Sequence, residues 1–325
     1  MIGNGSIDFS LSNVWKSWFL FRKGKRKTKE LESFQYHLEE NLWRLYVDLN
    51  NGKYRHGGYR HFTIKEKKRR DIAVASIRDR VCHRLVYEYL VSVFDKTFIY
   101  DAWSCRKDKG VVGAIERAES FLRKYPKSFV WRADISKFFD NVDQSALLGT
   151  ISRKIKDEKA IWLIENIIRS YSRGGLKQTG RRGIPIGNLT SQVFANIYLN
   201  EFDRFVEHQL QPQSYLRYGD DFIIIARSRT EIETIRPRAM DFLSDALKME
   251  INRKNDIIVP CRSGLFFLGV EIYPTGRRLR KSFWQLLDER LDLKNVASYF
   301  GLVRQHDCKK MNLLNWMIYN RMEKI

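Results

Sequence analysis

The amino-acid sequence predicts an α+β fold, in which an antiparallel sheet is backed by helices. Short runs rich in aromatic and β-branched residues at 129–135, 222–225 and 266–272 are typical of strands, because such side chains pack well on a pleated surface. Apolar residues that recur every three or four positions predict amphipathic helices around these runs. With only six prolines and no internal repeat in 325 residues, we expect one continuous body built of subdomains.

The N-terminal region is predicted to be helical and basic. A basic run at 22–29 follows an aromatic segment at 14–19, and a second basic cluster lies at 65–70. A single basic run is often only a solvated helix face, but repeated clusters favour a surface that binds phosphates. One helical stretch is expected to carry these apolar residues: Phe34, Leu38, Leu42 and Leu45. We expect nucleic-acid contacts from Arg22, Lys23, Lys25, Arg26, Lys27, Arg78 and Arg80, with Arg84 on the same helical segment as the last two.

The middle of the chain alternates strands and helices. After the strand at 129–135, apolar periodicity predicts helices near 148–155 and 161–171, followed by a glycine-rich basic connection at 172–187. The next helix is expected to begin near Thr190 or Ser191, since either hydroxyl can cap it.

A hairpin is predicted at 215–226, with Gly219 and Asp220 at its tip and a very apolar return strand. A helix follows from about Thr230, which Pro237 either kinks or begins. Another strand pair at 266–272 precedes about forty residues that are again helical, basic and aromatic.

Charge narrows the class of partner. The 59 Lys and Arg residues exceed the 38 Asp and Glu residues, so the formal net charge is +21. An excess of this size indicates a polyanionic partner. No apolar run approaches the ~20 residues of a transmembrane helix, and the first ten residues lack the layout of a secretory signal. We therefore expect a nucleic-acid partner, no membrane, and a cytosolic location.

The four cysteines predict no zinc finger and no disulfide framework. Cys82, Cys105, Cys261 and Cys308 form no CxxC pair, and no histidine lies at zinc-finger spacing, so we interpret them as reduced thiols. The stretch 306–308, His-Asp-Cys, could hold a metal, but we expect a surface loop there.

Three carboxylates stand where chemistry is expected. Asp134 ends an apolar strand, and Asp220 and Asp221 sit at the tip of the hairpin. Adjacent carboxylates repel, so a short turn beside four apolar residues is an unusual place for them unless a cation sits there. If the two strands are neighbours, three hard oxygen ligands meet and can hold Mg²⁺, and a pair of such ions serves in-line nucleotidyl transfer. The alternative is an ordinary hairpin turn, which Asp and Gly favour.

Further motifs follow one another along the chain in the order found in reverse transcriptases, which the sequence resembles from about residue 40 to residue 305. Residues 69–72 and 77–81 are similar to the fingers motif of bacterial and group II intron-type enzymes, and 104–110 resembles their next block. The remaining matches are to palm motif A (134–140), motif B (183–192), motif C (218–221), motif D (247–254) and the primer grip (267–269).

The resemblance implies a right-hand polymerase fold and assigns roles to further residues. It implies fingers with a basic extension at 1–128, a palm at 129–282 with interleaved fingers helices at about 155–182, and a short helical thumb at 283–325. It implies two Mg²⁺ ions, replaceable by Mn²⁺, held by the three aspartates and the backbone carbonyl of Ile135. Residues implied to bind the incoming dNTP are Arg70, Lys68, Phe139, Ile186, Gly187, Gln192 and Lys254. Those implied to grip the primer are Phe267, Leu268 and Gly269.

Two of these residues carry a specific expectation. Phe139 stands at the position of the family's steric gate, where a ring excludes a 2′-hydroxyl; its alternative is plain core packing beside Phe138. Ile186 replaces the glutamine that many family members have before the motif B glycine. An aliphatic side chain cannot hydrogen-bond near the nucleotide, so we expect low fidelity.

The form of motif B resembles the enzymes of diversity-generating retroelements. That resemblance implies error-prone cDNA synthesis on a template RNA, with a structured non-coding RNA and a small basic accessory protein as partners. The alternatives are a defence-associated or retron-like reverse transcriptase in antiphage immunity, a maturase-like RNA-binding protein that needs no polymerisation, and an RNA-dependent RNA polymerase. The intact aspartates and Phe139 disfavour the maturase-like protein. Phe139 and the flanking motifs disfavour the RNA polymerase, which shares the Gly-Asp-Asp turn.

Overall fold

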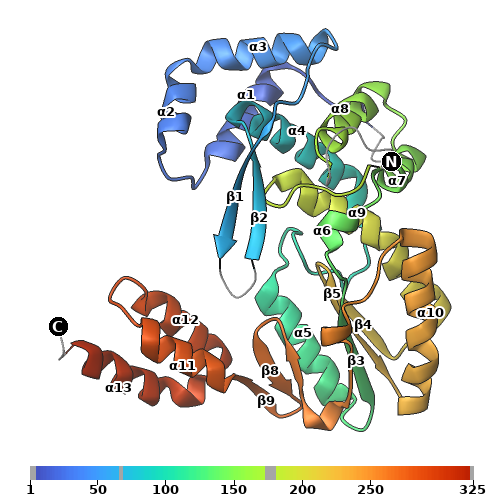
Figure 1. Cartoon of the computed structure of the whole chain (residues 1–325), viewed down its shortest axis with the longest axis vertical. Coiled ribbons are helices and arrows are strands. Elements are labelled where there is room, and N and C mark those ends of the chain that lie inside the picture. The colour runs from blue at the N-terminus through green and yellow to red at the C-terminus, as the bar shows by residue number, and fades with distance from the viewer. Residues whose placement is uncertain (1–4, 66–68, 173–180, 323–325) are drawn as a thin grey trace.

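The computed structural model describes residues 5–65, 69–172 and 181–322. The strands of its sheets pair with one another in antiparallel orientation. Among these residues there is a four-stranded sheet of order β4-β5-β3-β6, a three-stranded sheet of order β7-β8-β9 and a β1-β2 hairpin (Figure 1). The strands are β1 (Tyr59–Lys65), β2 (Arg69–Ala75), β3 (Phe129–Asp134), β4 (Ser214–Tyr218), β5 (Asp221–Ala226), β6 (Ile257–Pro260), β7 (Leu265–Phe267), β8 (Val270–Tyr273) and β9 (Gly276–Leu279).

Both faces of the four-stranded sheet are buried. Successive side chains of a strand point to opposite sides, so each strand contributes to two apolar clusters. In β3, Trp131 and Ala133 join one apolar cluster, whereas Val130 joins another. The first face is covered by α9 (Leu189–Phe205) and α10 (Arg229–Leu247). The second is covered by α5 (Val111–Lys124) and the three-stranded sheet (Figure 1). The predicted strand at 129–135 and the predicted hairpin at 215–226 are thus confirmed.

The remaining helices gather at two ends of the molecule. Near the N-terminus, α1 (Leu11–Arg22), α2 (Lys29–Tyr36) and α3 (Leu38–Asn50) pack around α4 (Ile77–Phe94). The short α6 (Phe138–Asn141) follows β3, and α7 (Gln144–Lys154) and α8 (Glu158–Arg169) follow it. At the other end, α11 (Lys281–Arg290), α12 (Val296–His306) and α13 (Met311–Met322) form a separate group reached through β9 (Figure 1).

Two local predictions need correction, and one of the two alternatives for Pro237 is excluded. The stretch with Phe34 to Leu45 is two helices, because His37 leaves the helical region (φ −108°, ψ 37°) and Asn41 ties the bend by donating to the Phe34 carbonyl at 3.0 Å. Helix α10 begins at Arg229, close to the predicted Thr230, and runs through Pro237, so Pro237 does not begin it.

Helix α9 is capped neither by Thr190 nor by Ser191. Its N-cap residue is Asn188, and the two hydroxyls serve tertiary contacts instead. Thr190 Oγ1 lies 2.8 Å from His83 Nδ1, and Ser191 Oγ donates to the Pro185 carbonyl at 2.6 Å. These bonds anchor the start of α9 to α4 and to the loop before it.

No disulfide joins the four cysteines, all of which are free thiols. The stretch 306–308 is only in part a surface loop: Cys308 is exposed, but His306 ends α12 and is buried, and Asp307 accepts a hydrogen bond from the Leu279 amide at 3.2 Å. Across the residues that the structure describes, no helix has the length and apolarity needed to cross a membrane.

Candidate active site

The three predicted carboxylates meet at one edge of the four-stranded sheet. Asp134, the last residue of β3, lies directly opposite Asp221, the first residue of β5. Asp220 stands in the turn between β4 and β5, and its carbonyl accepts a hydrogen bond from the Ile135 amide at 3.1 Å. Gly219 opens this turn with a φ of +65°, a left-handed conformation that glycine adopts without strain. The pairing of β3 with β5 therefore brings together acidic residues that are far apart in the chain.

The carboxylates differ in their partners. Asp221 forms a bidentate ion pair with Arg132, whose Nε and Nη2 lie 3.0 and 2.7 Å from its two oxygens. Asp134 Oδ1 is buried and lacks a hydrogen-bond partner among the described residues, while its Oδ2 faces Asn252 Nδ2 at 3.4 Å. A buried acceptor without a partner is costly, which marks this oxygen as a ligand position.

A divalent cation fits this donor set. Carboxylate and carbonyl oxygens are the ligands that Mg²⁺ prefers, and the cluster supplies them from two adjoining strand ends. No trio of His, Cys, Asp or Glu is already gathered as a metal-binding group in the described part of the chain. One of the three carboxylates, Asp221, is held by its ion pair with Arg132.

A second buried ion pair fixes the turn that carries Asp220. Arg217 of β4 is fully buried and pairs with Asp203 of α9, at 2.7 Å from Nε and 2.5 Å from Nη2. Its Nη1 also donates to the Gly219 carbonyl at 3.0 Å. The turn is therefore anchored to the buried helix α9.

The motif B loop is bonded to the β1-β2 hairpin. Ala73 of β2 donates its amide to the Ile186 carbonyl at 3.0 Å, and Asn188 Nδ2 donates to the Ala73 carbonyl at 2.8 Å. Gly187 has a φ of +111°, and a Cβ there would lie 2.8 Å from Ile72, so both conformation and space require glycine. Ile186 is half-buried and Gln192 is exposed on α9.

The other residues expected to bind dNTP lie in several elements. Phe139 is half-buried on α6, next to Phe138, which is buried as expected. Lys254 is exposed, two residues after Asn252, whose amide donates to the Asp134 carbonyl at 2.9 Å. The backbone of Arg70 pairs with Ile64 in the β1-β2 hairpin, whereas Lys68 falls outside the described residues.

The expected primer-grip residues form the turn between β7 and β8. Phe267 is fully buried, and Leu268 and Gly269 have φ values of +49° and +89°, as a two-residue hairpin turn of type I′ requires. The Arg132 guanidinium lies 5.7 Å from the Phe266 ring and 6.0 Å from the Phe267 ring. This hairpin is thus in contact with the residue that holds Asp221.

The expected nucleic-acid-binding residues fall into two groups. Arg78 is engaged inside the protein, paired with Asp48 at 2.6 Å and stacked on Tyr54 at 4.8 Å. The others lie at or just after the end of α1 or, for Arg80, on the facing side of α4, and most are exposed: Arg22, Lys23, Lys25, Arg26, Lys27 and Arg80.

The sequence analysis missed four residues of the site. Arg132 and Arg217 are charged positions inside otherwise apolar strands, and that pattern was the available signal for them. Asp203 had no signal in the sequence. Asn252 lies within the predicted motif D without a role of its own.

Comparisons with known proteins agree with this geometry. Residues 56–272, more than half of the chain, match the family model described as reverse transcriptase (RNA-dependent DNA polymerase). The chain is 24% identical to protein YkfC of Escherichia coli (strain K12), over 70% of this chain and 65% of YkfC. It is also 24% identical to the group II intron-encoded protein LtrA of Lactococcus lactis subsp. cremoris, over 75% of this chain and 51% of LtrA. The chain thus spans between about half and about two thirds of these curated relatives.

Among solved structures, the chain is similar to telomerase from Candida albicans in complex with a fragment of telomeric RNA. The TM-score is 0.52 with 12% sequence identity, over 81% of this chain and 53% of that chain. At this identity the likeness concerns the fold alone.

Proposed function

Because this chain belongs to the reverse transcriptase (RNA-dependent DNA polymerase) family and has the right-hand polymerase fold, we propose that it copies an RNA template into cDNA. The observation that carries the proposal is the register of β3 and β5, which sets Asp134 opposite Asp221 beside the Asp220 turn. An ordinary hairpin turn has no need of a third carboxylate on the neighbouring strand.

The proposed catalytic residues are Asp134, Asp220 and Asp221. Together with the Ile135 carbonyl they would hold two Mg²⁺ ions, for which Mn²⁺ can substitute. Ions held there would supply a lower pKa for the primer 3′-hydroxyl and positive charge for the triphosphate and the leaving pyrophosphate. The role of the protein would be to orient these ligands. Arg132 holds Asp221, Asn252 contacts Asp134, and Arg217 anchors the turn that carries Asp220.

We assign nucleotide binding to residues around this edge. Arg70 and Lys68 would clamp the triphosphate, and Lys254 would protonate the pyrophosphate. Phe139 would exclude ribonucleotides by its ring. Gly187 and Gln192 would line the nucleotide site with Ile186, whose aliphatic side chain cannot hydrogen-bond there. Phe267, Leu268 and Gly269 would position the primer.

Subdomain roles follow from the same proposal. Residues 1–128 would act as fingers, 129–282 as palm with fingers helices at about 155–182, and 283–325 as a short thumb. The fingers and thumb would clasp template RNA and the primer or cDNA strand mostly through phosphates, so binding should weaken steeply with salt.

We further propose that the enzyme is error-prone and works in a diversity-generating retroelement, in the prokaryotic cytosol or nucleoid. The sequence of motif B supports this, since Ile186 removes a hydrogen-bonding side chain near the nucleotide. Its partners there would be a structured non-coding RNA and a small basic accessory protein. The alternative is a defence-associated or retron-like enzyme. A template and variable repeat pair beside the gene would support the first role, and a defence island would support the second.

Primer extension tests the proposed activity. We expect the wild-type protein to extend a primer on RNA with dNTPs and Mg²⁺, and Asp134→Asn, Asp220→Asn and Asp221→Asn each to abolish extension. The matched control is Asp245→Asn, an exposed aspartate on α10 that is not one of the three clustered carboxylates. Undiminished synthesis in the three variants would refute the enzyme assignment. RNA binding without synthesis by the wild type would favour a maturase-like protein, and use of NTPs alone an RNA polymerase.

A further inference from the structure

A pocket of about 410 Å³ lies beside the motif B loop, between α1, α4 and the start of α9. Four lysine and arginine side chains line it, Lys23 and Lys25 from the segment after α1 and Arg80 and Arg84 from α4. Gly187 and Gln192 line another side of it. Lys25 lies outside the part of the chain that matches the family model, which begins at residue 56.

The two arginines present donors that nothing satisfies. The Nε atoms of Arg80 and Arg84 are buried and have no hydrogen-bond partner within the described ranges. Their other ends are engaged, since Arg80 Nη2 lies 3.4 Å from Glu30 and Arg84 Nη2 lies 2.7 Å from Glu88. Buried donors without acceptors are costly, so this arrangement favours a ligand that brings oxygen atoms.

Like charges are also crowded here. The Lys25 ammonium and the Arg80 guanidinium both lie against the Phe21 ring, at 4.8 and 5.3 Å from its centre. Burial, and next the charges of Arg80 and Arg84, lower the pKa of Lys25. An anion in the pocket would relieve this repulsion.

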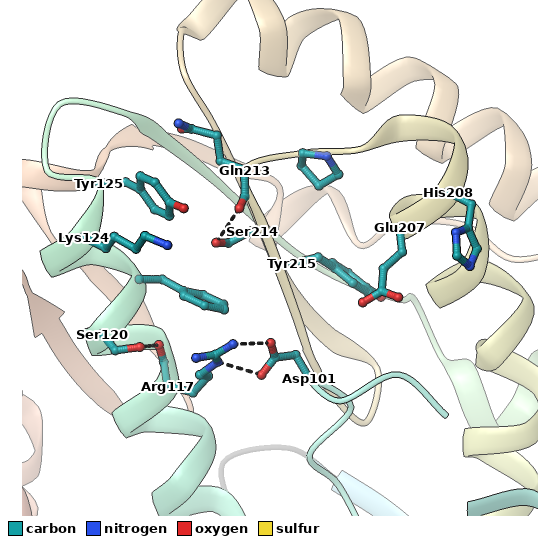
Figure 2. A pocket seen from close by; sticks show the side chains of 12 residues that line it. Asp101, Arg117, Ser120, Lys124, Tyr125, Glu207, His208, Gln213, Ser214 and Tyr215 are labelled. Carbon is teal, nitrogen blue, oxygen red and sulfur yellow. Dashed lines mark hydrogen bonds and ion pairs between the residues drawn. The ribbon is translucent and has the colours of Figure 1, made fainter. Parts of the chain in front are cut away.

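A second pocket shows what a satisfied arginine looks like. It lies at the β4 edge and has a volume of about 580 Å³ (Figure 2). There Arg117 donates from Nε and Nη2 to the two oxygens of Asp101, both at 2.9 Å. The Nε donor of this arginine is therefore satisfied by the protein itself. The arginines of the first pocket lack such a carboxylate at Nε.

We propose that Lys25, Arg80 and Arg84 form a binding site for a backbone phosphate of single-stranded template RNA. Phosphate oxygens accept from arginine in a fixed, charge-assisted geometry. A strand bound here lies next to Gly187 and Gln192, so the pocket would hold the template as it reaches the nucleotide site. The inference rests on the proposed function, which supplies the template.

The test is RNA binding as a function of salt. A short fluorescein-labelled oligoribonucleotide without secondary structure is titrated with the full-length protein at several KCl concentrations. Each phosphate contact contributes about 0.7 to the slope of log affinity against log salt for a single strand. We expect Arg84→Gln and Lys25→Gln each to lower the slope by about this amount and to weaken binding roughly tenfold.

The matched control is Arg229→Gln. Arg229 pairs with Glu233 four residues later at 2.9 Å, as Arg84 does with Glu88, but on the exposed surface of α10. This variant loses the same charge and should keep the wild-type slope. If Arg84→Gln behaves like Arg229→Gln, the proposed site is wrong.

Competition separates the sources of phosphate. If dATP displaces the RNA from the wild type but not from Arg84→Gln, the pocket holds a nucleotide and the template assignment is overturned. Equal, weak competition by dATP and inorganic phosphate in both proteins supports the template. RNA binding needs no catalysis, so the two proposals can fail separately. If the wild type makes no cDNA but still has a steeper salt slope than Arg84→Gln, the proposed function is refuted and the phosphate site is supported.

Discussion

Arg132 and Asp221 form a bidentate ion pair on the edge of the sheet that carries the proposed catalytic aspartates, with N–O distances of 3.0 and 2.7 Å. Arg132 precedes Asp134 by two positions on β3, so both side chains point to the same face. One buried cation thus shares a face with the clustered carboxylates and offsets part of their mutual repulsion. It also contacts Phe266 and Phe267, which couples the β7-β8 hairpin to the site.

Replacing Arg132 should make the protein more dependent on divalent ions. Arg132→Met removes the bidentate ion pair of Asp221, which we expect to destabilise the ion-free protein by about 1–3 kcal/mol. Magnesium should restore more stability than it adds to the wild type, because binding stabilises the folded state by mass action. Thermal unfolding with increasing MgCl₂ measures this. Arg236→Met, which breaks the similar pair with Asp256, is the control, and equal magnesium shifts in all three proteins would contradict the expectation.

The ring of Phe139 is expected to exclude ribonucleotides. Phe139→Ala should raise the incorporation of rNTPs relative to dNTPs by at least about tenfold, since the 2′-hydroxyl would then fit. Single-nucleotide primer extension with each substrate gives the ratio. Phe138→Ala provides the contrast: this neighbour is buried, so its truncation should cost about 3–5 kcal/mol of stability without a change in sugar preference. An unchanged ratio in Phe139→Ala would mean that the ring is only packing.

Ile186 is expected to set fidelity. Ile186→Gln introduces a side chain that can hydrogen-bond near the nucleotide, worth on the order of 1 kcal/mol, so misincorporation opposite adenine should fall severalfold. Sequencing of cDNA made on a defined RNA measures the error rate. Ile186→Val keeps the aliphatic character and should leave errors unchanged. Misincorporation that is the same in all three proteins would rule out this mechanism.

His83 should make the fold sensitive to acid. Its Nε2 lies 2.9 Å from His56 Nε2 and its Nδ1 2.8 Å from Thr190 Oγ1. Burial, and next the charges of His56 and Arg80, lower the pKa of His83 to about 3. The unfolded chain therefore takes up a proton that the folded chain refuses. Stability from this group is complete above the ordinary pKa of about 6.5 and is lost as the pH falls towards 3, by about 1.4 kcal/mol per pH unit.

Urea unfolding from about pH 7 to about pH 4 tests this effect. His83→Gln, which retains hydrogen-bonding groups but does not titrate, should show a shallower loss of stability than the wild type. His208→Gln provides a comparison on an exposed helix end. Parallel curves for the wild type and His83→Gln would show that His83 is not the responsible group.

The Arg217–Asp203 pair should be required for stability and for the position of the turn that carries Asp220. Both side chains are fully buried, so Arg217→Met leaves an uncompensated charge and should cost about 3–5 kcal/mol. The double variant Arg217→Met with Asp203→Asn should recover part of that loss in urea unfolding. It should still be slow in primer extension, because the Gly219 carbonyl has lost its donor. Equal destabilisation in the single and double variants would argue against the buried charge as the cause.

Periodicity and turn residues predicted β3, the β4-β5 hairpin and helices α7, α8 and α10 at or close to their observed places. These elements depend on neighbouring residues along the chain. Where tertiary contacts compete with local preference, the predictions failed: Thr190 and Ser191 bond to His83 and Pro185 rather than cap α9.

By itself, the sequence determined which side chains could perform the chemistry: the aspartates at strand ends, the glycine of motif B, and the excess of cations. Only the tertiary structure decided that Arg132 holds Asp221, that Arg217 anchors the turn through Asp203, and that Lys25 joins Arg80 and Arg84 around one pocket. The reason is physical. Local patterns report which face of a strand or helix is buried, whereas the partner of a buried charge is chosen by packing between elements that are distant in the chain.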